Sequence, residues 1–172
     1  VFVLLPIVAD AYTLKVAIEV LVFALASFSL ALLISNSGIV SFGHAAYFGI
    51  GAYAAGLLAT KAGISMVPAL ILAPLIAAAF AAFYGIFIVR LGGIYLAMLT
   101  LAFAQITYAV AFQWVELTGG DNGVVGVWPS DWARERIVYY YLTLLLCGAA
   151  VAALFHIIHA PFGYALRAAR DS

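Results

Sequence analysis

Five apolar runs, each long enough to cross a lipid bilayer as a helix, dominate this sequence. They cover residues 12–34, 39–60, 68–89, 94–117 and 136–159. A membrane-spanning helix needs about 20 residues, because the hydrocarbon core is about 30 Å thick and a helix rises about 1.5 Å per residue. We therefore predict an all-α protein, a polytopic bundle of about five complete transmembrane helices.

The scarcity of charged residues supports this assignment. Only 8% of the 172 residues are charged, and the seven basic and seven acidic side chains cancel to a formal net charge of zero. A soluble domain carries about 25% charged residues, which it needs to cover its water-facing surface. A nucleic-acid binder would also need a basic stripe. The composition thus excludes a soluble enzyme, a disordered chain and a nucleic-acid binder.

The two ends of the sequence differ from these runs. Residues 1–9 are apolar but too short to span a bilayer, so we interpret them as the end of a partial first span. A secretory signal is the alternative, although no basic residues precede the stretch. Residues 161–172 carry Arg167 and Arg170 three apart, which predicts a short amphipathic helix at the membrane surface. We expect residues 1–172 to form a single transmembrane domain.

Polar side chains within the apolar runs are the first candidates for function. Gln105 lies in the middle of the fourth run, near Thr100, and lipid offers an amide no hydrogen-bond partner. Gln105 therefore either bonds a neighbouring helix or lines a pathway. His44, near the start of the second run, is either a proton relay or substrate contact, or a neutral side chain bonded to the interrupted backbone.

The second run is unusually rich in glycine and alanine. Several of these small residues lie four positions apart, on one face of a helix. In lipid, small residues allow two helix backbones to approach closely. We expect helix packing at Gly49, Gly51, Ala55 and Gly56.

The sequence contains no recognisable catalytic or metal-binding motif. The glycine-rich loop 118–123 lacks the Gly-Lys-Ser/Thr ending of a phosphate-binding loop, and its acidic spacing does not fit a calcium loop. His156 and His159 lack a neighbouring carboxylate or thiolate, and Cys147 is the only cysteine. We expect no catalytic residue, no metal and no cofactor in this chain.

Four segments together carry a family resemblance. They cover 41–56 (SFGHAAYFGIGAYAAG), 91–105 (LGGIYLAMLTLAFAQ), 117–126 (LTGGDNGVVG) and 160–172. In order and spacing they resemble the LivM-type permease subunits of branched-chain amino acid ABC transporters, over nearly the whole chain. Ala160 departs from this pattern, because many relatives have Ser there. The resemblance implies a bacterial inner-membrane permease subunit that moves small hydrophobic amino acids inward. It also implies further helices beyond the end of this sequence.

The resemblance implies a division of labour between subunits. Two ATP-binding cassette subunits would bind ATP and magnesium, a periplasmic binding protein would deliver substrate, and a second homologous permease would complete the pathway. The absence of a phosphate-binding loop in this sequence is consistent with that division. Basic residues in loops tie at three against three, so they give no orientation. The resemblance places Arg90 and residues 160–172 in the cytoplasm and residues 118–135 in the periplasm.

Two sets of site residues follow from the resemblance and the polar positions. The set predicted to lie in or beside the contact with the ATPase is Phe162, Leu166, Arg167 and Arg170. The weaker candidates for the substrate pathway are Ser41, His44, Thr100 and Gln105.

Other functions and substrates stay open at this point. A secondary transporter or channel for small polar or amphipathic solutes would need ionisable groups within the membrane. Lys15 and Glu19 lie near the start of the first run, where they can pair or reach the interface, and Glu116 and Arg136 lie at the ends of their runs. The sequence does not distinguish leucine, isoleucine and valine from urea or amides as substrates.

Overall fold

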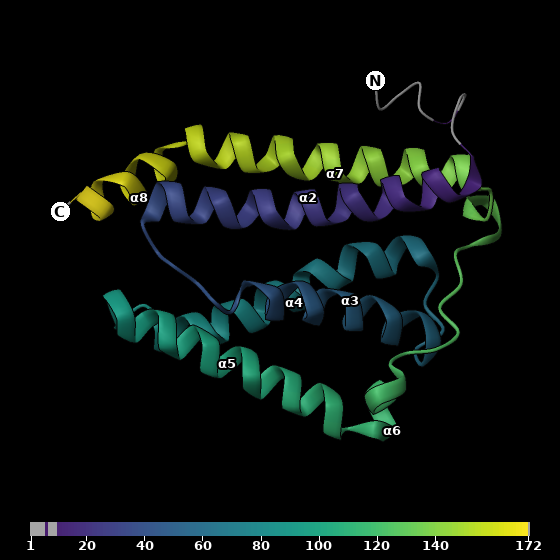
Figure 1. Cartoon of the computed structure of the whole chain (residues 1–172), viewed down its shortest axis with the longest axis horizontal. Helices are drawn as coiled ribbons and strands as arrows, with labels where there is room; N and C mark the ends of the chain where they lie inside the picture. Colours follow the sequence, from purple (N-terminus) through teal and green to yellow (C-terminus); the bar gives the residue numbers. More distant parts are fainter. Residues whose placement is uncertain (1–5, 7–9, 172) are drawn as a thin grey trace. The chain divides into compact units, whose positions relative to one another are not determined.

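The computed structural model describes residues 6 and 10–171, and helices dominate this range (Figure 1). They are α2 (Ala11–Ser37), α3 (His44–Thr60), α4 (Met66–Ile88), α5 (Gly93–Gln113), α6 (Val115–Thr118), η1 (Gly120–Asn122), η2 (Asp131–Ala133), α7 (Arg136–His159) and α8 (Pro161–Asp171). The all-α prediction is confirmed. The partial span predicted over residues 1–9 lies outside the described residues, apart from Pro6.

Four of the helices are long and apolar enough to cross a membrane: α2, α4, α5 and α7, with 21 to 27 residues each. The fifth predicted span, 39–60, forms a shorter helix, because α3 begins only at His44 and has 17 residues. At a rise of about 1.5 Å per residue, α3 is about 25 Å long, less than the hydrocarbon thickness of about 30 Å. Four membrane-length helices are therefore established, and a fifth crossing stays a prediction.

The first span extends three residues further than its apolar run. Its polar residues prolong the helix because their side chains bond carbonyl groups one turn back: Asn36 Nδ2 donates to the Leu32 oxygen at 2.9 Å. The helix ends at Gly38, whose φ of 67° is left-handed and whose N–H donates to the Ile34 oxygen at 3.0 Å. Helix α2 therefore ends because of Gly38, and the polar residues 35–37 before it are still helical.

The predicted single helix over 94–117 is wrong in its last turn. The chain leaves helical geometry at Trp114 (φ −83°, ψ 64°), and α6 follows as a separate turn. The Thr118 hydroxyl lies 2.5 Å from the Ala111 carbonyl oxygen and 2.8 Å from that of Trp114. The buried hydroxyl thus serves the Ala111 carbonyl, which the interruption leaves without its helical partner, whereas the Trp114 carbonyl also accepts the N–H groups of Leu117 and Thr118.

The chain divides into two compact units, one with α2, α7 and α8 and the other with α3 to α6. In the first unit, α2 and α7 lie side by side and run in the same direction (Figure 1). The Cys147 thiol lies 3.8 Å from the Leu21 carbonyl oxygen, and the rings of Phe28 and Phe155 lie 5.8 Å apart. Contacts that advance together along both helices are those of a parallel pair.

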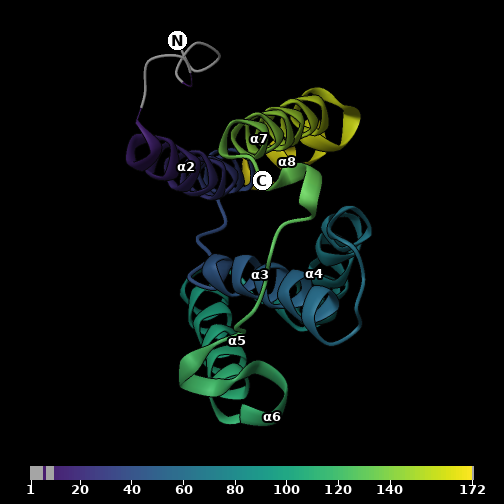
Figure 2. The ribbon, with the colours of Figure 1, turned by 90° about the vertical axis from the view of Figure 1, so that its right-hand side faces the viewer.

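In the second unit, α3 packs closely on α4 (Figure 2). Small residues form the buried positions of this pair, among them Ala54 on α3 and Ala69 and Ala73 on α4. A Cβ atom at Gly51 would lie 3.9 Å from the Ala77 Cβ, which is ordinary van der Waals contact. Close backbone approach therefore follows from the small side chains, as in other membrane helix pairs. The prediction of one transmembrane domain stays a prediction.

The α4–α5 contact is aromatic and contains one polar pair. Tyr84 is buried, and its ring stacks on Phe103 with centroids 4.3 Å apart. Its hydroxyl lies 2.9 Å from Thr107 Oγ1, and the Thr107 hydroxyl donates to the Phe103 carbonyl oxygen at 2.8 Å. This pair satisfies two hydroxyl groups within membrane-length helices, where lipid offers them no partner.

Candidate functional site

The basic helix α8 begins at a sharp turn after α7. Ala160 is extended (φ −77°, ψ 163°), and Pro161 occupies the first helical position, where its missing N–H costs nothing. Gly163 is buried, and a Cβ atom there would overlap the backbone of Ile158. The glycine therefore permits α8 to turn directly beneath the last turn of α7.

Arg167 of α8 binds the ends of two other helices in the same unit. Its Nε donates to Asn36 Oδ1 of α2 at 2.9 Å, and its Nη2 donates to the Ile158 carbonyl oxygen of α7 at 3.1 Å. The Tyr164 ring lies under the guanidinium, 5.3 Å from its carbon to the ring centroid. The planar guanidinium thus holds α2, α7 and α8 together through fixed donors.

Arg170 makes a second contact with the end of α2. Its Nη1 donates to the Ser35 carbonyl oxygen at 2.5 Å. Its aliphatic stem passes over Gly38, where a Cβ atom would lie 2.8 Å from Arg170 Cγ. Ser35 is in the last turn of α2, so its carbonyl is one of those without a helical partner.

The electrostatics of this end explain why two arginines gather there. Since α2 and α7 run in parallel, their carboxy-terminal ends lie at the same end of the unit (Figure 1). Each helix end carries unpaired carbonyl groups and a partial negative charge of about half an electron. Arg167 and Arg170 bring positive charge to that end and donate to its carbonyl groups.

The sequence did not reveal the partners of these arginines. In the sequence, residues 35–38 (SNSG) indicate only a turn that ends the first apolar run. The polar residues at the end of an apolar run were the available signal. Their pairing with residues more than 130 positions later depends on the parallel packing of α2 and α7, which no local pattern encodes.

The four residues predicted for the ATPase contact face different surroundings. Arg167 and Arg170 bond the ends of α2 and α7, and Leu166 is half-buried. Phe162 is 62% exposed and its neighbour Tyr164 is 60% exposed. Phe162 and Tyr164 are two positions apart and therefore lie on different sides of α8, and the role of all four residues in coupling stays a prediction.

Two of the four pathway candidates lie in one place, where the segment before α3 meets α5. Ser41 and Thr100 are both buried, and the Phe42 N–H donates to Thr100 Oγ1 at 3.1 Å. The Thr100 hydroxyl donates in turn to the Ala97 carbonyl oxygen at 2.7 Å. A Cβ atom at Gly43 would lie 2.7 Å from the Thr100 carbonyl oxygen, so only glycine fits this approach. These contacts fix a non-helical segment against α5.

The other two candidates lie elsewhere in the same unit. His44 is the first residue of α3 and is half-exposed. Gln105 is exposed, and no hydrogen bond joins it to another residue in the part of the chain that the structure describes. Exposed apolar residues at intervals of three and four share its face of α5: Ile94, Met98, Leu101, Tyr108 and Phe112.

The predicted packing residues differ in their surroundings. Gly51 faces Ala77, and Gly56 is buried, with its Cβ position 3.4 Å from Val124. A Cβ atom at Gly49 would meet nothing within 4 Å, and Ala55 is half-buried.

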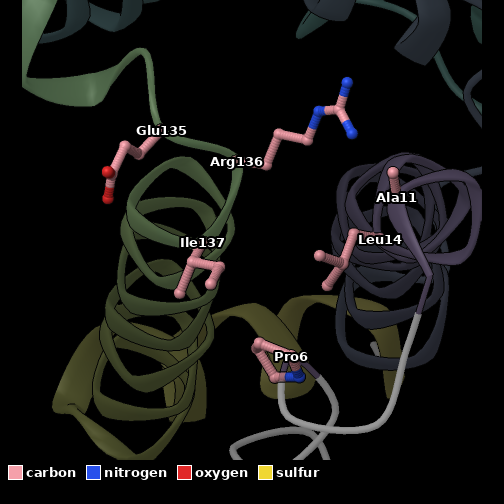
Figure 3. A pocket seen from close by; sticks show the side chains of 6 residues that line it. All are labelled: Pro6, Ala11, Leu14, Glu135, Arg136 and Ile137. Carbon is pink, nitrogen blue, oxygen red and sulfur yellow. The ribbon is translucent and has the colours of Figure 1, made fainter.

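A recess of about 350 Å³ opens between the starts of α2 and α7 (Figure 3). Its lining residues are Pro6, Ala11, Leu14, Glu135, Arg136 and Ile137. Figure 3 shows Leu14 and Ile137 pointing toward each other, while the Glu135 carboxylate points away from α2. A ligand site needs a few converging polar groups in an apolar cleft. We therefore assign this recess no ligand.

No group of three or more His, Cys, Asp or Glu side chains that could hold a metal lies within the described residues. The expected absence of a metal and of a cofactor stays a prediction. The membrane-length helices expose a large apolar surface, and this combination defines the class of protein. The class is that of multi-pass membrane proteins.

The comparisons with known proteins place the chain within this class. It belongs to the family described as "Branched-chain amino acid transport system / permease component", which matches residues 12–172. The predicted resemblance to LivM-type permeases is thereby confirmed, and the chain is a multi-pass inner-membrane protein of a permease family.

Two curated relatives are named "High-affinity branched-chain amino acid transport system permease protein LivM". The one from Escherichia coli (strain K12) is 28% identical over 193 residues, which cover 96% of this chain and 45% of the relative. The one from Salmonella typhimurium (strain LT2) is 26% identical over 197 residues, with the same coverage. The chain thus spans less than half the length of these relatives. No solved structure matches it significantly.

Proposed function

We propose that this chain belongs to the permease subunit of an ABC importer that moves branched-chain amino acids inward across the bacterial inner membrane. The family match over residues 12–172 is the observation that carries the proposal. The four membrane-length helices agree with it. The names of the two relatives, both branched-chain amino acid permeases, suggest the substrate class.

In this proposal ATP is hydrolysed in other subunits. Two ATP-binding cassette subunits bind ATP and magnesium, a second homologous permease completes the pathway, and a periplasmic binding protein delivers the amino acid. The loop 118–123 has glycine turns but no phosphate-binding lysine, which supports this division. ATP binding then drives transport because it favours one arrangement of the subunits over another.

We place Arg90 and residues 160–172 in the cytoplasm and residues 118–135 in the periplasm. Two observations support opposite sides for the two segments. The membrane-length helix α7 separates residues 118–135 from α8, and α5 separates them from Arg90. In this orientation α8 is an amphipathic helix at the cytoplasmic surface, with its arginines on α2 and α7 and its exposed aromatic residues available to the ATPase.

We place Gln105 on the pathway, where α5 meets the second permease. An exposed amide halfway along a membrane-length helix needs a polar partner, because lipid provides none. A neighbouring permease or a water-filled pathway would supply one. Ser41, His44 and Thr100 lie closer to the start of α3, and Thr100 has a structural task there as well.

Co-purification tests this function. The full-length permease, tagged and extracted in mild detergent, should bring down two ATPase subunits and the second permease. A secondary transporter or channel would bring down none of them. In the same complex, reversing the charges of Arg167 and Arg170 should abolish ATP-driven uptake while membrane insertion stays normal. Undiminished uptake by that variant would refute the coupling role of α8.

A further inference from the structure

We propose that the contact between α8 and the end of α2 passes the movement of α8 directly to α2. This α2–α8 contact consists of Arg167 and Arg170 of α8 and of Ser35, Asn36 and Gly38 of α2. In this proposal Asn36 and Gly38 are residues that position α8. The inference rests on the proposed function, in which α8 receives the force of the ATPase.

Arg167 forms hydrogen bonds with two other helices of this chain. Its guanidinium donates to Asn36 Oδ1 and to the Ile158 carbonyl oxygen, at 2.9 and 3.1 Å. Hydrogen bonds from a charged donor are stronger than neutral ones, and the guanidinium plane fixes both directions at once. Any shift of α8 must therefore either carry the end of α2 with it or break these bonds.

Asn36 is oriented to receive Arg167. Its Nδ2 donates to the Leu32 carbonyl oxygen at 2.9 Å and lies 3.2 Å from Ser35 Oγ. With the amide nitrogen held on its own helix, the oxygen is left to face the guanidinium. The acceptor therefore keeps one direction. A carboxylate would keep an acceptor for the guanidinium but would lose the donor to the Leu32 carbonyl, and a hydrophobic residue would lose both.

Gly38 makes room for Arg170. Its φ of 67° ends α2, and the missing side chain leaves space that the Arg170 stem fills, with Cγ 2.8 Å and Cδ 3.2 Å from the Cβ position. The same passage lets Arg170 Nη1 reach the Ser35 carbonyl oxygen. Any side chain at this position would strain the backbone and push Arg170 away.

The α2–α8 contact lets a movement of α8 displace the whole of α2. Helix α2 has 27 residues and is therefore about 40 Å long, enough to reach across the bilayer. A continuous helix moves as a unit, so a displacement of its cytoplasmic end also appears at its other end. Through Arg167 and Ile158 the same displacement acts on α7. This makes α2 and α7 the first membrane helices to respond to the ATPase.

The first test measures whether the contact holds α8 in place. In the full-length permease without ATPase subunits, spin labels at Ala31→Cys and Ala168→Cys, both exposed positions, report the α2–α8 distance in a Cys147→Ser background. We expect one narrow distance distribution. Asn36→Ala should shift the balance between docked and released α8 about tenfold towards release. Asn36→Asp, which keeps the acceptor, should retain the narrow distribution.

Two further variants keep the test decisive. The Arg170 side chain is exposed, so the Arg170→Gln protein should fold even if the Asn36→Ala protein does not. We expect α8 to be released in Arg170→Gln as well. Thr143→Ala is the matched control, because it removes a side-chain hydrogen bond to its own helix, from the Thr143 hydroxyl to the Tyr139 carbonyl oxygen at 2.9 Å, at a position outside the contact. A distribution that stays narrow in both Asn36→Ala and Arg170→Gln would overturn the proposal.

The second test measures transmission in the assembled transporter. Substrate moved per ATP hydrolysed should fall at least fivefold in Asn36→Ala and stay near the wild-type ratio in Asn36→Asp. An unchanged ratio with α8 released would also overturn the proposal, since the contact would then transmit nothing. Failure of the wild-type permease to bind any ATPase is a different result. It would refute the proposed function and withdraw the coupling role, while the spin-label distances still report the contact itself.

Discussion

Thr100 shows how a single hydroxyl can organise an irregular segment at membrane depth. It accepts the Phe42 N–H and donates to the Ala97 carbonyl oxygen, so its hydrogen-bonding capacity is used by the backbone. The segment before α3 is not helical, and lipid cannot satisfy its N–H groups. The pathway candidate with the most buried side chain thus has a structural task that its sequence position did not reveal.

Replacing Thr100 by valine should therefore destabilise the protein. The change conserves shape but leaves the Phe42 N–H without its acceptor, which costs about 1–3 kcal/mol when the group is buried. The measurement is the free energy of unfolding by SDS titration in mixed micelles. Thr100→Ser, which keeps the hydroxyl, is the control and should lose less than half as much. Equal stability of the valine variant and wild type would show that water or lipid headgroups already satisfy this segment.

At the scale of elements, the small residues of α3 differ in whether they contact α4. Gly51 faces Ala77 of α4, whereas the Cβ position of Gly49 meets nothing. Both glycines are in the interior of α3, so a substitution at either changes helix propensity by the same amount. The two positions therefore form a matched pair that isolates packing.

Gly51→Leu should separate α3 from α4, and Gly49→Leu should not. Overpacking costs about 1–3 kcal/mol at a closely packed position, against about 0.5 kcal/mol or less at an open one. The same unfolding titration measures both. If the two variants had equal stability, the small residues of α3 would not be packing determinants in this pair.

The elements themselves were largely predictable, and their ends were not. Apolar runs located the four membrane-length helices, because hydrophobic length is a property of the sequence alone. The end of α2 was missed because the side chains of Asn36 and Ser37 bond back to their own helix. The interruption at Trp114 was missed because Val115 and Leu117 are as apolar as the helix before them.

The candidate site was predictable in part. The basic residues of α8 stood out in the sequence, and their partners depended on which helix ends meet in three dimensions. Gln105 was expected either to bond a neighbouring helix or to line a pathway. It bonds no residue in the part of the chain that the structure describes, and its place on a pathway stays a prediction.

At the scale of the whole molecule, the exposed face of α5 should join a second permease. Gln105→Leu removes the amide from this face, and interhelical hydrogen bonds in membranes contribute about 1 kcal/mol, which corresponds to about fivefold in affinity. Fluorescence energy transfer between labelled permeases in proteoliposomes measures the association. Gln113→Leu is the control, since it lies at the end of α5 where water satisfies an amide. Unchanged association of the Gln105 variant would mean that this amide does not lie in the contact between the two permeases.

In the function that we propose, this chain is part of a permease driven by ATPase subunits. The direct measurement is uptake of radiolabelled leucine into proteoliposomes that contain the full-length permease, the second permease and the ATPase pair, with ATP on the ATPase side and the binding protein on the opposite side. We expect uptake that requires both ATP and the binding protein and stops when either is left out. Uptake that continues without ATP, driven by an ion gradient alone, would contradict the claim.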